Sequence, residues 1–205
     1  FVTIKETLRY CKAKPSIKKL IYISSAAIYG EFKNLKKLKP LSPYGKNKLL
    51  SEKLCTKYHQ KYKLDLAILR LFSVYGVGLK KQLLWEASKK LSKNNLTFYG
   101  DGEESRSWIN ILDVIKAITC VIKNKKSFFI SDVAPRNQVK VKNILSILSK
   151  NFKINSQNLS FNGIKKKGDP KHQKIILQNI FKLGWRPTVI LETGIKKYAK
   201  WFSKQ

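Results

Sequence analysis

Apolar residues recur along this chain in two patterns, helical spacing and short continuous runs. Helical spacing is first seen at Ile4, Leu8 and Cys11, and Pro15 ends it. Continuous runs, beginning with residues 20–23, are short enough for strands that are buried on both faces. The alternation of such runs with helical segments predicts an α/β fold with a parallel sheet.

The same patterns predict the remaining elements. Predicted helices cover residues 43–61, 80–93, 112–123, 139–150 and 191–202, and predicted strands cover residues 65–71, 96–99 and 127–131. In the helix that begins at residue 43, we expect Leu50, Leu54 and Tyr58 to form the buried stripe. Gly184 is expected to end a helical segment before the final helix.

The start of the helix at residue 43 carries the first candidate chemistry. Ser42 can cap the free backbone amides, and Pro43 suits the first helical position because its missing N–H has no helical partner there. Tyr44 and Lys48 are four residues apart and should share one face of the helix. The helix dipole and the lysine ammonium both favour the phenolate, so Tyr44 is a candidate general base.

The spacing of this pair is not specific by itself. With 9 Tyr and 38 Lys in 205 residues, chance predicts about 1.7 Tyr-x-x-x-Lys pairs. The chain contains three, at Tyr10/Lys14, Tyr29/Lys33 and Tyr44/Lys48. The context distinguishes the third pair, because a capped helix begins there and a predicted strand that ends in hydroxyl residues precedes it.

Polar and aromatic residues follow two of the predicted strands at their carboxyl ends. Ser24 and Ser25 follow the run at 20–23, and Phe72 and Ser73 follow the next strand. The carboxyl ends of parallel strands lie at the sheet edge where open α/β folds bind ligands. We therefore expect these residues to lie near a ligand.

The charge suggests a different class of function, which the composition does not support. The formal net charge of +31 is typical of proteins that bind polyanions such as nucleic acid. However, the basic residues are 38 Lys and only 5 Arg, they occur in every segment, and 21 Ile and 13 Asn accompany them. This combination indicates that the positive charge reflects a compositional bias and lies mainly on solvated faces. No platform of aromatic and basic residues for nucleic acid is evident. Nucleic acid is not the expected partner.

The cysteines and the hydropathy also limit the options. Cys11, Cys55 and Cys120 are scattered, so they suggest buried free thiols in a reducing cytosol and no metal site. The sequence has no apolar run of 18 or more residues. We expect a cytoplasmic protein without a membrane partner.

Several motifs in order resemble one known family. They are ISSAAIYG from residue 23, PLSPYGKNKLLSEKL from residue 40, LRLFSVYG from residue 69, FYGDGEESRSWINILDV from residue 98, and KKKGDP and KLGWRP from residues 165 and 182. Together they resemble the extended short-chain dehydrogenase/reductases, and among these the NAD-dependent nucleotide-sugar epimerases and dehydratases. The resemblance covers nearly the whole chain.

The resemblance implies the later part of a Rossmann-type parallel sheet with a small mixed α/β C-terminal substrate lobe. Residues 1–78 and 108–135 would form the partial NAD(P)-binding domain, and residues 79–107 and 136–205 the substrate lobe. The sequence contains no Gly-x-x-Gly-x-x-Gly turn for the cofactor pyrophosphate. We therefore expect a fragment whose 205 residues alone do not retain NAD.

The resemblance also implies roles for individual residues. Ser25, Tyr44 and Lys48 would be catalytic, and the NAD contacts would come from Ser24, Tyr44, Lys48 and Phe72. The nucleotide diphosphate sugar would contact Ser25, Ser73, Arg106 and Lys166. Relatives commonly have Asn at the position of Ser73 and often Arg at that of Lys166. A lysine can still neutralise phosphate as a point charge, and a solvated surface residue is the alternative interpretation of Lys166.

The implied reaction is epimerisation of a nucleotide-sugar through a transient keto-sugar, in a protein that is a homodimer at full length. Dehydratases of the family place Asp and Glu directly after the strand-end hydroxyl, and this chain has Ala26 and Ala27 there. Epimerase is therefore favoured over 4,6-dehydratase, while a keto-sugar reductase stays open because it uses the same Ser, Tyr and Lys. The non-enzyme alternatives are an inactive remnant and a basic module that binds polyanions.

Overall fold

The computed structural model describes residues 2–31, 38–164, 168, 170–173, 175, 176 and 178–205. Its helices are α1 (Val2–Ala13), α2 (Pro43–Tyr62), α3 (Gln82–Leu91), α4 (Ile111–Lys123), α5 (Val141–Lys150) and α6 (Leu191–Phe202). Short 3-10 turns are η1 (Ala26–Ile28), η2 (Ser156–Asn158) and η3 (Asn179–Leu183). Its strands are β1 (Leu20–Ser25), β2 (Leu66–Leu71), β3 (Ser73–Tyr75), β4 (Thr97–Phe98), β5 (Ser105–Arg106), β6 (Trp108–Asn110), β7 (Phe128–Val133), β8 (Val139–Lys140) and β9 (Ser160–Phe161).

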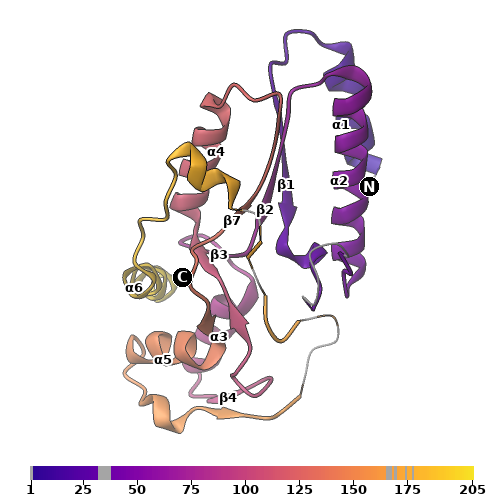
Figure 1. The fold of residues 1–205 in the computed structure, drawn as a ribbon. Coiled ribbons are helices and arrows are strands. Elements are labelled where there is room, and N and C mark those ends of the chain that lie inside the picture. The colour runs from indigo at the N-terminus through magenta and orange to yellow at the C-terminus, as the bar shows by residue number, and fades with distance from the viewer. Residues whose placement is uncertain (1, 32–37, 165–167, 169, 174, 177) are drawn as a thin grey trace.

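The main sheet has the strand order β1-β2-β7, and both pairings are parallel. Helices α1 and α2 lie on one side of it and α4 lies on the other (Figure 1). Successive side chains of a strand point to opposite faces. Accordingly, Leu66 and Ile68 of β2 pack with α1 and α2, whereas Ala67 and Leu69 pack with α4. Because β2 is buried on both faces, its sequence is a continuous apolar run.

The second part of the fold contains α3, α5 and α6, which lie together below the main sheet in Figure 1. Their buried core includes Leu84 of α3, Leu145 and Leu148 of α5, and Ile195 and Tyr198 of α6. Three short strand pairs, β3-β6, β4-β9 and β5-β8, lie outside the main sheet. Helical spacing of apolar residues on each helix explains why the three pack against one another.

Most predicted elements are confirmed, and two details differ. Leu50 is 49% exposed, so its assignment to the buried stripe of α2 is wrong. Leu54 and Tyr58 do pack against a buried cluster, as predicted. The face that α2 turns inward also carries small or hydrogen-bonded residues, among them Gly45, Ser51 and Glu52. The second difference is that α5 begins only at Val141, because the two residues before it form β8 and pair with β5.

The three cysteines are free thiols, as expected. Cys11 and Cys55 are buried, and burial raises the pKa of both thiols, that of Cys55 to about 12. Cys120 is only half-buried, and its thiol donates a hydrogen bond to the carbonyl oxygen of Leu183. In the described part of the chain, no helix is long and apolar enough to cross a membrane.

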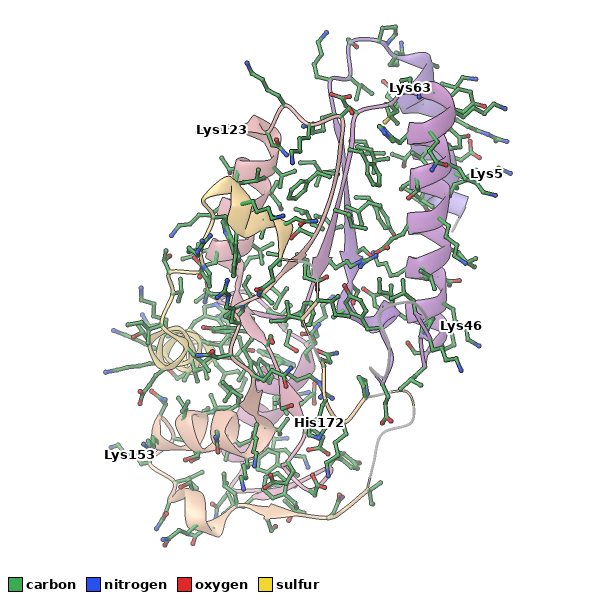
Figure 2. The ribbon with its side chains drawn as sticks, viewed as in Figure 1. Lys5, Lys46, Lys63, Lys123, Lys153 and His172 are labelled. Atoms are coloured by element: carbon green, nitrogen blue, oxygen red, sulfur yellow. The ribbon has the colours of Figure 1, made fainter. Side chains whose placement is uncertain are left out.

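Lysine side chains project from both parts of the fold. The labelled Lys5, Lys46, Lys63, Lys123 and Lys153 extend outward from different elements (Figure 2). All five are exposed. The positive charge is therefore not confined to one face, which agrees with a solvated surface.

Candidate active site

The end of β1 forms one side of the candidate site. Ser25 is its last residue, and the Ser25 hydroxyl accepts a hydrogen bond from the Ala27 amide at 3.2 Å, which caps the short turn η1. Ser24 lies on the opposite face of the strand and is 2% exposed. Its hydroxyl has no hydrogen-bond partner among the described residues. The two serines therefore present hydroxyls to opposite sides of the sheet.

The first turn of α2 has the predicted capping geometry. Ser42 is in an extended conformation, and its hydroxyl accepts a hydrogen bond from the Gly45 amide at 3.1 Å, while Pro43 takes the first helical position. This cap satisfies a backbone amide that has no helical partner. Tyr44 is 56% exposed, and the Lys48 ammonium lies 5.8 Å from the centre of its ring. The predicted common face of Tyr44 and Lys48 is confirmed.

Lys48 connects this helix to the strand that ends in Ser25. Its ammonium donates a hydrogen bond to the carbonyl oxygen of Ile23 at 2.7 Å. It also lies 5.0 Å from the centre of the Tyr22 ring. Burial lowers the pKa of Lys48, and the charge of Glu52 partly opposes this effect. The ammonium is thus fixed between α2 and β1.

The other two Tyr-x-x-x-Lys pairs have different surroundings. Tyr29 is buried and hydrogen-bonded, and Lys33 lies outside the described residues. Tyr10 is 59% exposed, with the Lys14 ammonium 6.0 Å from its ring centre. Tyr29 follows the short turn η1 at the end of β1, but its hydroxyl is bonded to Asp132 and Arg70 in the interior. Tyr10 lies near the end of α1 and not at a capped helix start. Structural context thus separates Tyr44 from the other two.

Gly45 allows α2 to approach the turn after β1. A Cβ built on this buried glycine would lie 2.4 Å from the carbonyl oxygen of Ala27. That carbonyl belongs to the backbone of η1, so a larger side chain must displace one of the two elements.

We expect Gly45→Val to destabilise the protein by about 1–3 kcal/mol, because overpacking at this contact moves α2 away from η1. Chemical denaturation measures the change. Lys57→Val is the control, since Lys57 is exposed on the same helix and measures the cost of a valine there without overpacking. Equal effects of the two variants would contradict this account.

A cavity of about 710 Å³ opens beside the carboxyl ends of β1 and β2. At that end it is lined by Ser25, Ala26, Ala27, Phe72 and Ser73. Its other walls come from α3 and from the segment between β4 and β6, including Lys90, Phe98, Tyr99, Glu104, Arg106 and Trp108. The cavity therefore joins the strand-end hydroxyls to a region that contains cations and aromatic rings.

Arg106 is the predicted site residue in the far wall of this cavity. It is 6% exposed, and its guanidinium donates hydrogen bonds to the carbonyl oxygens of Ser105 at 2.8 Å and Lys171 at 3.1 Å. These bonds fix the plane of the guanidinium, which suits two-point binding of phosphate oxygens. A neighbouring loop carboxylate, Glu104, also lines the cavity.

The predicted residues are only partly brought together. Ser25, Phe72, Ser73 and Arg106 line the cavity, whereas Ser24, Tyr44 and Lys48 are outside its lining. Lys166 lies outside the described residues. The sequence analysis missed several wall residues, notably Lys90, Glu104 and Trp108. The one local signal for them was the aromatic pair Phe98-Tyr99 before the glycine-rich turn at 100–102.

Comparison with known proteins identifies a family and a fold. Residues 2–132 match the model of the NAD dependent epimerase/dehydratase family. An uncharacterized UDP-glucose epimerase YtcB of Bacillus subtilis (strain 168) is 36% identical over 125 residues, which are 58% of this chain and 39% of that protein. A dTDP-D-glucose 4,6-dehydratase of Mus musculus is 26% identical over 200 residues, which cover 92% of this chain and 56% of that protein.

A solved structure shows the same fold. The UDP-glucuronic acid 4-epimerase of Bacillus cereus, crystallised with UDP-glucuronic acid and NAD, superposes with a TM-score of 0.89 at 27% identity. The match covers 99% of this chain and 67% of that one. Matches to three curated relatives span between 39% and 67% of the length of each relative. The expected Rossmann-type sheet is confirmed, and the chain belongs to the NAD-dependent epimerase/dehydratase family.

Proposed function

We propose that the protein containing these residues epimerises a nucleotide-sugar through a transient keto-sugar, with NAD as its cofactor. The observation that carries the proposal is the hydrogen bond from Lys48 to the Ile23 carbonyl. It fixes the helix face of Tyr44 and Lys48 beside the strand that ends in Ser25, next to the 710 Å³ cavity. Relatives named as epimerases support the reaction class.

Lys48 and Ser24 fit the ribose end of a dinucleotide. Lys48 is half-buried, and an ammonium has three donors, whereas the hydrogen bond to Ile23 uses one of them. The Ser24 hydroxyl is buried without a partner among the described residues. Both groups could bind hydroxyls of the nicotinamide ribose. NAD, when bound, would accept a hydride from the sugar carbon and return it.

The residues of the chain then have distinct roles. Tyr44 takes the proton of the sugar hydroxyl as the carbonyl forms and returns it after the keto-sugar has turned over. Ser25 donates a hydrogen bond to the same oxygen, and the Lys48 ammonium stabilises the phenolate form of Tyr44. Arg106 binds the diphosphate, which holds the nucleotide while the sugar ring turns.

The cavity favours epimerisation over dehydration. Both kinds of enzyme occur among the relatives, so the distinction has to come from this chain. A 4,6-dehydratase needs an additional acid and base to remove water across two carbons. The residues directly after Ser25 are Ala26 and Ala27, and both line the cavity with methyl groups that cannot transfer a proton.

The same cavity supports the proposed domain division. Residues 1–78 and 108–135 would form the cofactor domain, and residues 79–107 and 136–205 the substrate lobe. The cavity is lined by Ser25 and Ser73 from the cofactor domain and by Phe98 and Arg106 from the substrate lobe. A nucleotide-sugar would then lie between the two.

The test is the incubation of the full-length protein with NAD and UDP-glucose or UDP-galactose. We expect interconversion of the two sugars without net accumulation of NADH, because the hydride returns to the sugar. Nuclear magnetic resonance of the products identifies the reaction. A 4-keto-6-deoxy product would indicate a dehydratase, and stoichiometric oxidation of NADH by a keto-sugar would indicate a reductase. Either result would overturn the proposal.

A further inference from the structure

We propose that a buried series of polar side chains positions the catalytic turn after β1 against helix α2. We call it the buried polar chain; its members are Glu52, Arg70, Tyr29 and Asp132. They act as positioning residues, since none of them lines the cavity. The inference rests on the proposed function for its effect on turnover, although the geometry itself can be tested without that function.

The hydrogen bonds of the buried polar chain are continuous. Arg70 binds Glu52 through two nitrogens, Nε to Oε1 at 3.0 Å and Nη2 to Oε2 at 2.7 Å. Its third nitrogen, Nη1, donates to the Tyr29 hydroxyl at 2.8 Å, and that hydroxyl donates to Oδ1 of Asp132 at 2.6 Å. All four residues are at most 6% exposed. Solvent therefore does not replace these bonds.

Each member comes from an element that carries or adjoins a candidate site residue. Glu52 is on α2, about two turns after Tyr44. Arg70 is near the end of β2, shortly before the strand-end residues that line the cavity. Tyr29 directly follows η1, the turn that Ser25 caps. The buried polar chain thus joins the helix of the proposed base to the turn of the proposed hydrogen-bond donor.

Asp132 extends this connection to the C-terminal part. It lies in β7, and its second oxygen, Oδ2, accepts a hydrogen bond from the backbone amide of Ile176 at 2.8 Å. Ile176 packs with Phe72 in the cluster under η1. The part of the C-terminal lobe around Ile176 is therefore fixed to the same buried polar chain.

The chemistry of the buried polar chain favours a positioning role over a gain in stability. A buried ion pair adds little net stability, because the loss of hydration offsets most of the attraction. A fully paired polar network, by contrast, favours one arrangement of the elements that it joins. Tyr29 must donate and accept at once, which requires the protonated phenol. Burial, together with the Asp132 carboxylate, raises the pKa of Tyr29 and keeps it protonated.

The experiment replaces Tyr29 by phenylalanine in the full-length protein, which removes the hydroxyl and keeps the ring beside Phe72. We expect kcat to fall about 10- to 100-fold while KM for the nucleotide-sugar changes less than about 2-fold, because misplacement affects the reacting groups more than binding. Glu52→Gln, which keeps the side-chain shape, is the second variant, and we expect a smaller loss of kcat.

Asp113→Asn is the matched control. Asp113 is 1% exposed and accepts hydrogen bonds from Thr188 and Val189, but it lies on α4, on the other side of the sheet. All variants are assayed at a temperature where circular dichroism shows each to be folded. We expect Asp113→Asn to lose stability and keep its kcat. Wild-type kcat in both Tyr29→Phe and Glu52→Gln would overturn the proposal.

Amide hydrogen exchange tests the geometry independently of turnover. The Tyr29 amide is bonded to the Ala26 carbonyl within η1, and the Lys46 amide to the Ser42 carbonyl at the start of α2. We expect exchange at both amides to be at least about 10-fold faster in Tyr29→Phe and unchanged in Asp113→Asn. Unchanged exchange in Tyr29→Phe would overturn the positioning role even if the protein lacks epimerase activity, whereas inactive wild type with faster exchange would overturn only the proposed function.

Discussion

We expect Tyr44→Phe to lower the turnover of the full-length protein by at least ~10²-fold and to leave the fold intact, because a general base contributes roughly 10²–10⁴-fold. The variant removes only the hydroxyl. Tyr44 is 56% exposed, so the fold does not depend on a buried bond of that group. Sugar interconversion and circular dichroism, measured on the same sample, separate loss of chemistry from loss of structure.

The chain contains a matched control for this prediction. Tyr10 has the same Tyr-x-x-x-Lys spacing, a similar exposure of 59% and a lysine ammonium 6.0 Å from its ring. Tyr10→Phe should retain wild-type turnover, because Tyr10 lies near the end of α1, which leads into the start of β1 and not its end. Ser25→Ala should reduce turnover less than Tyr44→Phe, since it removes a hydrogen bond and not the base. Near-wild-type turnover in Tyr44→Phe would contradict the mechanism.

The elements that the sequence predicts well are those whose signals are local. The strand β2 is a continuous apolar run, and the start of α2 is marked by Ser42 and Pro43. The parallel sheet follows from the alternation of strands with helices. Even the shared face of Tyr44 and Lys48 depends only on helix geometry.

Features that depend on tertiary packing were not predicted. Arg70 and Glu52 are charged, and such residues are rarely buried without a partner, so neither is expected in the interior until the other is known to face it. Their pairing also explains why α2 turns Glu52 inward and leaves Leu50 exposed. The positions of Lys90 and Glu104 in the cavity wall were not predicted for the same reason, because separate elements bring these residues together.

The second large effect concerns binding. We expect Arg106→Met to weaken the binding of UDP by about 10- to 100-fold, because charge-assisted hydrogen bonds of a fixed guanidinium are lost. Isothermal titration calorimetry with UDP alone measures this without requiring turnover. Thermal unfolding of the same samples shows whether the two carbonyls that Arg106 now contacts, of Ser105 and Lys171, were also important for stability.

One further variant separates the charge of Arg106 from its geometry, and a second variant is the control. Arg106→Lys keeps a positive charge but replaces the planar fork with a point charge, so its affinity should lie between those of wild type and Arg106→Met. Arg136→Met is the control, because Arg136 is exposed, contacts the Phe181 ring and does not line the cavity. With 43 basic residues, general attraction of an anion would affect both sites alike. Equal UDP affinity in Arg106→Met and Arg136→Met would therefore exclude β5 as the diphosphate site.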